Sequence, residues 1–339
     1  MNLVRAALTV AVLLGSGGAA WAAVLKVGPD EALKLPSQAA RVAKDGDTVE
    51  IAPGEYMDCA IWYQNGITIT GPADPATPAV LTDATCQGKA VFVIIGREAT
   101  VRHLTFARAR VIDGNGAGIR AEGPGLTVAH SRFVNNQSGI LSAPNADTTI
   151  LVQDSVFERN GAAGERCVAT LEIGGVGLLR VERSRFAAAR ACDMVRARGV
   201  GRTEVIDSRF EDGAEGAARH MVVVEGGGGL LVRGSHFARG PRAGAAAAVV
   251  LRDLAGSGGG VEMRDSVLEN GSGRPLVLLH AVLPGRAVVS GNRVGAGDAE
   301  LDESGYWTAW ARGSARATVD AARQAAGAAK RAVRSVLPY

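Results

Sequence analysis

A six-residue pattern recurs along the chain: an aliphatic residue, two variable residues, a small polar residue, another variable residue and a large apolar residue. Between the copies, runs rich in Val, Ile, Leu and Thr alternate apolar with polar positions and are bounded by Gly, Asn, Asp and Pro, as short strands are. A repeat step in the twenties with variable length predicts a solenoid, because turns absorb insertions while stacked positions stay fixed. The large apolar positions of the pattern are Phe106, Phe133, Phe157, Phe186, Phe210, Phe237, Leu268 and Val294.

The repeats favour strands over helices. Helical solenoids have longer repeats with 3.6-residue amphipathicity, and the leucine line of leucine-rich repeats is missing here. A turn of about 25 residues accommodates three short strands and three bends. We therefore predict an all-β parallel β-helix of about ten rungs, in which each rung rises by one strand spacing of roughly 4.8 Å.

Within one repeat, residues 118–122 and 126–129 are predicted strands, a bend follows at His130, and Asn135 turns the chain towards the next repeat. Asn and Asp tolerate left-handed backbone angles and hydrogen-bond to their equivalents when stacked. We interpret the recurring Ser, Asn and Phe residues as structural, with Phe133 and its equivalents pointing into the interior.

An N-terminal segment adds a second signature. Residues 38–56 have the order of a capping helix, a Gly46-Asp47 turn, a strand and a Pro-Gly pair that leads to Tyr56. Together with the repeats, this segment resembles the right-handed parallel β-helix, or pectin-lyase-like, superfamily over residues 38–297. The resemblance implies a single right-handed coil. It says little about activity, since members include lyases, hydrolases, epimerases and binding or adhesive proteins.

Residues 1–22 have the features of a secretory signal peptide. Arg5 precedes an apolar stretch, and Ala20-Trp21-Ala22 is a small-x-small cleavage site. The stretch is too short to span a bilayer, and no later run of 18 apolar residues follows. We predict a bacterial protein that is periplasmic or secreted, with the β-helix domain at 23–297.

Both ends of the coil are predicted to be capped. Ser37 is expected as the N-cap of a helix that runs through Ala43 and covers the first rung, whose edge would otherwise be open. Residues 298–339 are expected to form an irregular C-terminal cap followed by a basic amphipathic helix. Such a helix could contact an anionic surface. Aromatic residues expected to pack on the last rung are Tyr306, Trp307 and Trp310.

The four cysteines are spaced by one repeat. Cys59 and Cys86 are 27 residues apart, and Cys167 and Cys192 are 25 apart. Each pair would therefore lie on neighbouring rungs, within the Cα distance that a disulfide needs. We predict these two disulfides; free buried thiols are the alternative, and metal binding is disfavoured because no Cys-x-x-Cys occurs.

Composition excludes some functions. The formal net charge of +3 argues against a dedicated nucleic-acid binder. Aromatic residues make up 4% of the chain, too few for a long Trp-lined sugar platform. No cofactor is predicted: Asp113 and Asn115 could touch calcium, but a turn is the simpler interpretation. His103, His130 and Asp154 occupy equivalent bends and form either a solvated ladder or, less simply, a metal site.

Strand alternation places both signs of charge on one outer face. If Ile119 and Ala121 point inward, Arg120 and Glu122 point outward, and the same parity applies to later rungs. The resemblance implies that ligands lie across such a face, although charged side chains on an exposed sheet face are most often only solubilising. The outward residues are Arg120, Glu122, Glu172, Arg196, Arg198 and Glu225.

Two chemistries are compatible with this face. Glycoside hydrolysis would use Glu122 and Glu172, which are two rungs or roughly 9.6 Å apart by strand spacing. Uronate lyases and epimerases instead need a cation to neutralise the sugar carboxylate, for which Arg120, Arg196 or Arg198 are available, and a base. Among the five histidines, His220 at the start of a face strand is the best acid/base candidate.

We therefore expect a protein that binds an acidic polysaccharide along this face, where the residues are compatible with cleaving or epimerising it. The alternative is a non-catalytic envelope or surface protein that uses the rod as a binding, adhesive or structural module. The hydrolase-type Asp-Asp and Gly-His-Gly motifs and the acidic calcium cluster of pectate lyases are missing from the sequence. The catalytic candidates are Arg120, Glu122, Glu172, Arg196 and His220, and the substrate-binding candidates are Arg198 and Glu225.

Overall fold

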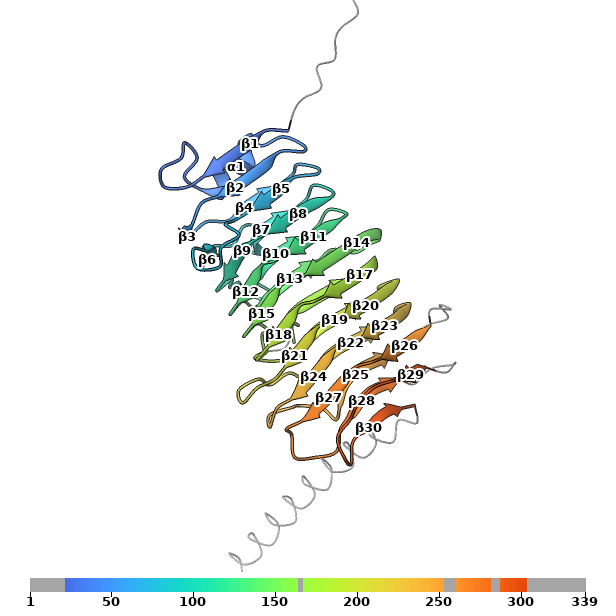
Figure 1. Cartoon of the computed structure of the whole chain (residues 1–339). Helices are drawn as coiled ribbons and strands as arrows, with labels where there is room; N and C mark the ends of the chain where they lie inside the picture. The colour runs from blue at the N-terminus through green and yellow to red at the C-terminus, as the bar shows by residue number, and fades with distance from the viewer. Residues whose placement is uncertain (1–21, 164–166, 253–259, 282–286, 304–339) are drawn as a thin grey trace, which may run out of the picture.

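Three parallel sheets run along the molecule, and each turn of the chain contributes one strand to each sheet (Figure 1). The computed structural model describes residues 22–163, 167–252, 260–281 and 287–303. The described chain is a right-handed parallel β-helix of about nine turns with one helix. The predicted fold class is thereby confirmed.

The first sheet has eleven strands and the second has nine. The strands of the first sheet are β1 (Val24–Val27), β2 (Thr48–Ile51), β5 (Thr68–Thr70), β8 (Ala99–Arg102), β11 (Leu126–Ala129), β14 (Asn145–Gln153), β17 (Val176–Glu182), β20 (Arg202–Ile206), β23 (Gly229–Arg233), β26 (Val261–Arg264) and β29 (Val288–Ser290). Those of the second sheet are β3 (Gly54–Tyr56), β6 (Ala79–Thr82), β9 (Leu104–Ala107), β12 (Arg132–Val134), β15 (Val156–Glu158), β18 (Arg185–Ala187), β21 (Arg209–Glu211), β24 (His236–Arg239) and β27 (Val267–Asn270).

The third sheet has ten strands and carries the surface that matters most below. Its last strand extends the coil beyond residue 297, where an irregular cap was expected. Its strands are β4 (Ala60–Trp62), β7 (Ala90–Ile94), β10 (Ala117–Ala121), β13 (Ser138–Ser142), β16 (Leu171–Gly174), β19 (Asp193–Arg198), β22 (His220–Glu225), β25 (Ala247–Arg252), β28 (Val277–Ala281) and β30 (Ala299–Asp302).

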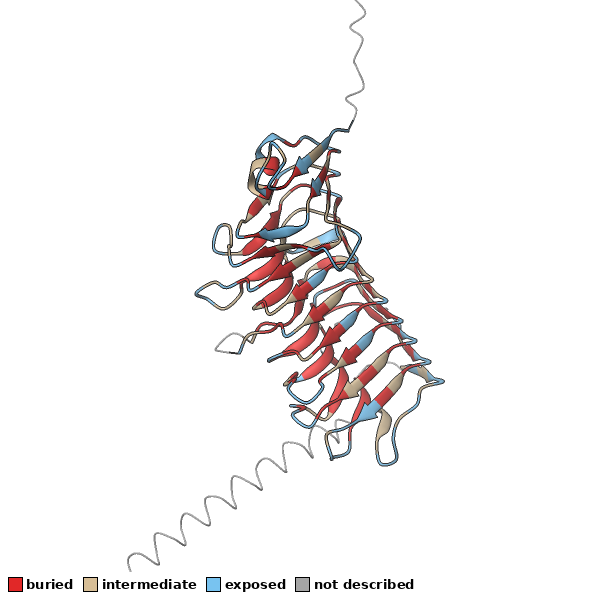
Figure 2. Ribbon diagram, turned by 60° about the vertical axis from the view of Figure 1, so that its left-hand side comes forward, coloured by how far each residue is buried: buried red, intermediate tan, exposed pale blue. Residues whose placement is uncertain are grey.

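A column of phenylalanine rings fills the interior behind the second sheet. Successive rings lie 4.6–5.1 Å apart and within 13° of parallel. Burial is concentrated along the inside of the coil (Figure 2). Gly118 and Gly139 face this column from the third sheet, where an added Cβ would approach Phe133 or Phe157 within 2.7 Å. The predicted interior column is confirmed; its members are Phe106, Phe133, Phe157, Phe186, Phe210 and Phe237.

Stacked serines form the bend between the first and second sheets. Ser155 Oγ donates to the carbonyl of Gln153 at 2.7 Å and accepts the amide of Ser131 from the preceding turn at 3.2 Å. The residue before each serine has a left-handed φ, such as 48° at His130 and Asp154. Because every buried hydroxyl and amide in the column has a partner, these serines serve the fold, as predicted. The column is Ser131, Ser155, Ser184, Ser208, Ser235 and Ser266.

Buried asparagines serve the bend between the second and third sheets. Asn160 Nδ2 donates to the carbonyl of Phe133 at 2.7 Å, and its Oδ1 accepts the amide of Asn136 at 2.9 Å. Both asparagines are completely buried. The amide group suits this position, because one end donates while the other accepts.

The N-terminal helix α1 spans Pro36–Val42 and packs on β4 and β1 at the first turn. It begins earlier than expected: Leu35 is the N-cap and Ser37 lies inside the helix. Proline has its φ preset for the first helical position and lacks the amide that would go unsatisfied there. The side-chain oxygen of Gln38 accepts the amides of Lys34 and Leu35, which precede the helix, at 2.6 and 3.3 Å.

Both predicted disulfides are present. Cys59–Cys86 and Cys167–Cys192 have Cα separations of 5.4 and 5.5 Å, because each pair joins adjacent turns. No helix in the described residues is long and apolar enough to cross a membrane. Several predictions fall outside the described residues. They concern the signal segment (all but its last residue), the basic C-terminal helix, and Tyr306, Trp307 and Trp310.

We expect Phe157→Ala to lower the free energy of unfolding by about 3–5 kcal/mol, because it opens a cavity between two stacked rings. Val156→Ala changes the neighbouring, outward-facing residue of β15 and should cost about 1 kcal/mol or less. Urea unfolding followed by circular dichroism measures both variants. Equal losses would show that the ring column is not the main interior contact.

Candidate functional site

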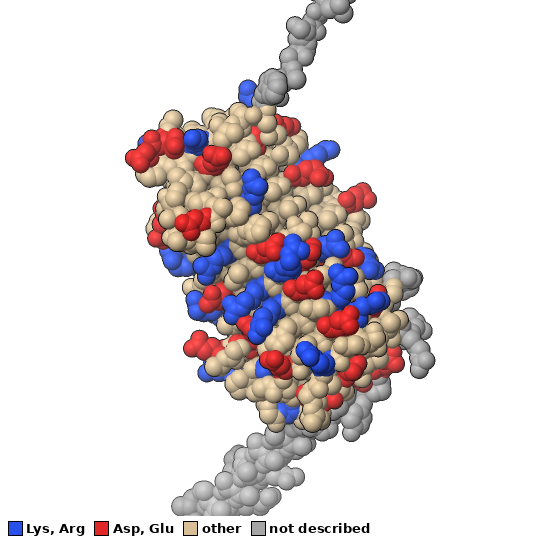
Figure 3. Space-filling model, in the orientation of Figure 1, with Lys and Arg blue, Asp and Glu red and all other residues tan. Residues whose placement is uncertain are grey.

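An open cleft of about 710 Å³ lies on the outer face of the third sheet. Its size is within the range of small-molecule binding sites. The surface of the rod is richest in mixed charge around its middle, as Figure 3 shows for one face. The charged and imidazole side chains lining the cleft are Arg120, Glu172, Asp193, Arg196, Arg198, Arg219, His220, Glu225 and Arg252.

The register of the third sheet brings these residues together from distant parts of the chain. Glu172 pairs with Arg196 on the next strand, and Asp193 pairs with His220. Along the strands' far ends, Glu225 lies between its register partners Arg198 and Arg252. Because adjacent parallel strands are about 4.8 Å apart, side chains in register touch directly.

Apolar clusters border this polar belt on both sides. Towards the N-terminal end, Val93 and Leu141 pack together on the outer side of the sheet. Towards the C-terminal end, Val223 and Val250 do the same. Arg120 lies in register between Val93 and Leu141, and Glu225 and Arg252 lie two residues beyond Val223 and Val250 on the same strands. Apolar and charged side chains therefore adjoin one another at the edges of the cleft.

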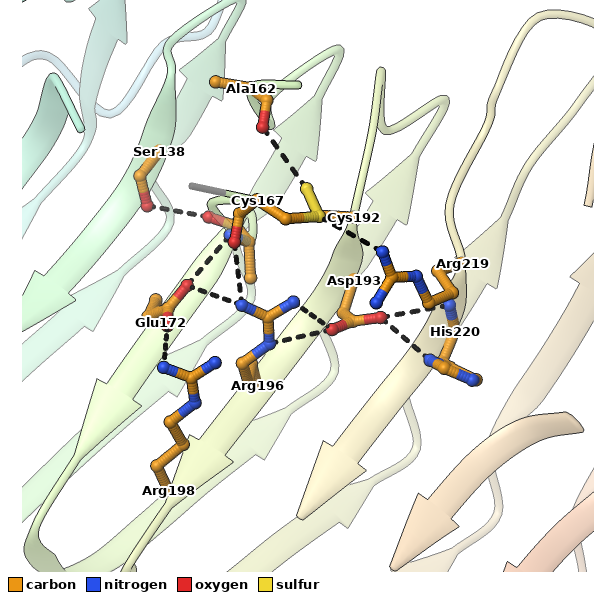
Figure 4. Close-up of a disulfide and its surroundings, with 11 residues drawn as sticks. Ser138, Ala162, Cys167, Glu172, Cys192, Asp193, Arg196, Arg198, Arg219 and His220 are labelled. Atoms are coloured by element: carbon orange, nitrogen blue, oxygen red, sulfur yellow. Dashed lines mark hydrogen bonds and ion pairs between the residues drawn. A yellow bond between two sulfur atoms is a disulfide. The ribbon is translucent and has the colours of Figure 1, made fainter. Parts of the chain in front are cut away.

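A hydrogen-bonded network crosses three strands at the base of the cleft (Figure 4). His220 Nδ1 lies 2.9 Å from Asp193 Oδ1. Arg196 donates to Asp193 Oδ2 from Nε at 2.8 Å and from Nη2 at 2.5 Å. Arg196 Nη1 also reaches Glu172 Oε2 at 3.3 Å and the carbonyl of Cys167 at 2.8 Å. Asp193 is thus held between a histidine and an arginine.

The Cys167–Cys192 disulfide anchors one wall of the cleft. Cys192 directly precedes Asp193, and Cys167 lines the cleft and accepts from Arg196. Figure 4 shows the bond lying above this network, beside Arg219. The disulfide therefore links the loop before β16 to the start of β19, where the histidine's partner begins the strand.

Burial sets the protonation of the pair. Burial lowers the pKa of His220, with Arg252 and Arg239 adding to the effect and Asp193 opposing it. Burial works against ionisation of Asp193, but the hydrogen bonds and charges of His220 and Arg196 outweigh it and lower the pKa of Asp193. An ionised carboxylate only accepts, so Nδ1 of the neutral imidazole carries the proton. Nε2 makes no hydrogen bond to any described residue and is left as the basic nitrogen.

Cations exceed anions in the cleft. Five arginines face three carboxylates, a difference of two positive charges with His220 neutral. Arg198 Nε lies 3.0 Å from Glu225, and Arg252 Nη1 lies 3.7 Å from Glu225. Arg219 forms no ion pair with any carboxylate of the described chain, and its Nη2 only approaches Cys167 Sγ at 3.9 Å. This guanidinium is therefore available to a ligand.

The structure brings together most of the residues that the sequence pattern singled out. Arg120, Glu172, Arg196, Arg198, His220 and Glu225 all line the cleft. Glu122 does not: its carboxylate is 2.7 Å from Lys89 and 3.5 Å from Arg120 Nε. Arg196, expected on an exposed face, is 4% exposed, because its outward side chain lies beneath the loop carrying Cys167.

Sequence reasoning missed Asp193 and Arg219; Arg252, which strand parity also places on the outer face, lines the cleft. Asp193 is the first residue of β19, ahead of the alternating part of the strand. Its position one turn before His220, adjacent to a bridged cysteine, is the signal that could have found it. Arg219 precedes a strand, and only the conformation of its loop directs it to the cleft.

The bend histidines form a ladder. The rings of His103 and His130 stack 5.0 Å apart at 5°, while Asp154 binds Arg183 at 2.8 Å. Within the described ranges, no group of three His, Cys, Asp or Glu side chains is placed to hold a metal ion. Asn115 lies on the rim of the cleft.

Comparison with known proteins finds similar folds only. No family model matches the chain, and no curated protein matches it. An alginate lyase from Paenibacillus sp. str. FPU-7 has 12% identity, a TM-score of 0.47, and coverage of 83% of this chain and 98% of its own. A tailspike depolymerase from Acinetobacter baumannii bacteriophage Fri1 has 10% identity, a TM-score of 0.39, and coverage of 82% and 60%. A pectin methylesterase from Aspergillus niger has 10% identity, a TM-score of 0.38, and coverage of 83% and 87%. At these identities, the chemistry must be argued from this chain's own cleft.

We expect the imidazole of His220 to titrate below the usual histidine value of 6.5. Because the folded-state pKa is lowered, the unfolded chain binds more protons, and stability should fall as the pH decreases below about 6.5. Asp193→Asn removes the charge that favours the imidazolium and should lower the titration midpoint further. Nuclear magnetic resonance of the ring nitrogens, assigned with His220→Gln, measures both; a midpoint above 6.5 would contradict the assignment.

Proposed function

We propose that this is an exported protein that binds an acidic polysaccharide in the cleft of the third sheet and removes a proton from a bound uronate. The observation that carries the proposal is the Asp193–His220 pair beside the guanidinium of Arg219, which has no ion pair with any carboxylate among the described residues. Proton removal of this kind is the first step of a lyase or an epimerase reaction, and we propose one of these two activities.

The charge of the cleft supports an anionic ligand. Guanidinium groups bind carboxylates in a planar, two-pronged geometry that suits Arg better than Lys. Arg198 and Arg252 balance Glu225, and Arg196 balances Asp193, so ligand binding at Arg219 and Arg120 breaks no internal ion pair between these groups. At Arg120 the ligand competes only with the 3.5 Å contact to Glu122, whose carboxylate also binds Lys89 at 2.7 Å.

Proton abstraction is favoured over hydrolysis by two carboxyl groups. Hydrolysis requires one carboxyl group to donate a proton to the leaving oxygen. Glu172, Asp193 and Glu225 each accept from an arginine, so each is held as an acceptor. Glu122, the other partner expected for hydrolysis, is outside the cleft and bound to Lys89.

His220 and Arg219 have distinct roles in the proposed reaction. His220 Nε2 takes the proton from the carbon next to the sugar carboxylate, and the released electron pair moves into the carboxylate as an enolate. Arg219 neutralises the charge that develops there. Loss of the neighbouring 4-oxygen, protonated by water, gives a carbon–carbon double bond; return of a proton to the opposite face instead gives the epimer. Asp193 holds the imidazole in the required tautomer.

Export is supported by two separate features. The first 22 residues have the order of a secretory signal, and both disulfides are of the kind that persists in oxidising compartments. We infer a periplasmic or secreted location. The basic C-terminal segment, with its predicted amphipathic helix, would suit contact with an anionic surface.

A non-catalytic binding or adhesive module is the second candidate, because the repeated rod also suits a spacer. Both candidates use the same cleft for binding. They differ in turnover, which depends on His220.

We expect the purified protein to bind uronate polymers more tightly than neutral glucans and to release unsaturated or epimerised products. His220→Gln should bind the polymer with little change but yield no product. Calorimetry measures binding, and absorbance of the unsaturated product together with sugar analysis measures turnover. Binding without product in the native protein would favour the adhesive module, and no binding to any uronate would refute the proposed function.

We expect Arg219→Ala to weaken uronate binding by about 10- to 150-fold, which corresponds to the roughly 1.5–3 kcal/mol of a charge-assisted hydrogen bond. Arg185→Ala, on the outer face of the second sheet, is the matched control for lost positive charge and should leave affinity unchanged. Equal losses would mean that the polymer is attracted by overall charge and not by the cleft. Titration calorimetry at a fixed salt concentration distinguishes these results.

A further inference from the structure

A completely buried ion pair lies at the bend between the second and third sheets, next to the segment that leads into β22. Arg239 is the last residue of β24, and Asp212 follows β21; their side chains have no solvent exposure. Arg239 Nε is 3.0 Å from Asp212 Oδ2, which also accepts the amide of Gly240 at 3.1 Å. Nothing in the repeat pattern calls for charges here, since Asn136 and Asn160 serve the same bend in earlier turns without them.

The remaining donors of Arg239 all point at the backbone that enters the cleft. Nη2 donates to the carbonyls of Ala218 and Arg219 at 2.9 and 3.2 Å, and Nη1 reaches the carbonyl of Arg219 at 3.3 Å. These two residues immediately precede His220. Nη1 also approaches the carbonyl of Ala247, where β25 begins, at 3.5 Å. One guanidinium therefore clamps the entry to two neighbouring strands of the third sheet.

A buried ion pair often adds no net stability compared with apolar residues in its place. Removing two charges from water carries a penalty that their mutual attraction often fails to recover, and apolar replacements of similar volume are often neutral or stabilising. Burial raises the pKa of Asp212 and lowers that of Arg239, so each resists its charged form. A neutral pair would suit a purely structural role better, which points to a use for the fork of donors.

We propose that Arg239, held by Asp212, is the positioning residue of the cleft: it holds the backbone of Ala218 and Arg219 so that Arg219 and His220 converge on one bound anion. This inference rests on the proposed function for the identity of the ligand. It extends that function by assigning the convergence of the two groups to a side chain that never touches the ligand.

The double variant Asp212→Asn/Arg239→Met separates positioning from stability. Asn keeps the acceptor for the amide of Gly240, and Met keeps much of the volume without the donors. We expect an unfolding temperature lowered by no more than about 4 °C and uronate affinity reduced about tenfold. Hydrogen exchange at the amides of residues 217–221 should accelerate, while exchange in β18 and β21 stays unchanged. Arg185→Met/Glu211→Gln removes a neighbouring ion pair of the second sheet that does not contact residues 217–221. It is the control and should change none of these.

Arg239→Lys distinguishes the effect of the several guanidinium donors from the effect of the positive charge. Lysine keeps the positive charge but cannot contact Asp212 and two carbonyls in one plane, so it should recover only part of the lost affinity. If Arg239→Lys keeps the native affinity and the native exchange rates, the proposal is overturned. This test holds even when the double variant does not fold. Unchanged exchange at residues 217–221 in a folded double variant would overturn it as well. If the native protein binds no uronate, the proposed function fails, and the exchange comparison alone decides whether Arg239 positions this segment.

Discussion

Parallel pairing between successive turns in a single register is the constraint on which every other feature depends. A shift of one residue would exchange the inner and outer faces of a strand. The serine column prevents such a shift, because each hydroxyl spans two turns and only one register gives every buried amide its acceptor. The stacked phenylalanines add a second lock, since a displaced ring would leave a cavity at one turn and a clash at the next. Both columns lie on the inside of the coil or at its bends.

This division leaves the outer faces free to vary. The interior of the third sheet is apolar over many turns, whereas its outer positions carry both apolar and charged side chains. Register then converts positions 24 to 27 residues apart into contacts, as for Glu172 with Arg196 and Asp193 with His220. The cleft thus arises from a few outward-facing residues that differ between turns, while the inward-facing residues that form the coil repeat. This explains why the fold alone does not identify the activity.

Much of the site could be found from the sequence, because the period of the coil and the alternation along strands are both visible there. These two regularities correctly placed Arg120, Glu172, Arg196, Arg198, His220 and Glu225 on one face. They failed for Glu122, since a long side chain at a strand end chooses its partner by local packing, here Lys89. They also failed for the environment of Arg196. Outward parity predicts exposure, but a disulfide-anchored loop covers this side chain and makes it a partner of Asp193.

By itself, the sequence determined the coil, its interior column, its bends and both disulfides, because each is a consequence of spacing between residues one turn apart. Only the tertiary structure decided which charges are buried, which are paired and which are free. Those properties depend on loops whose length and conformation differ from turn to turn. The loop at Cys167 covers Arg196, and the loop before β22 places Arg219 in the cleft. The buried Arg239–Asp212 pair belongs to the same category, since its energetics come from complete removal from water and no spacing in the sequence reveals that.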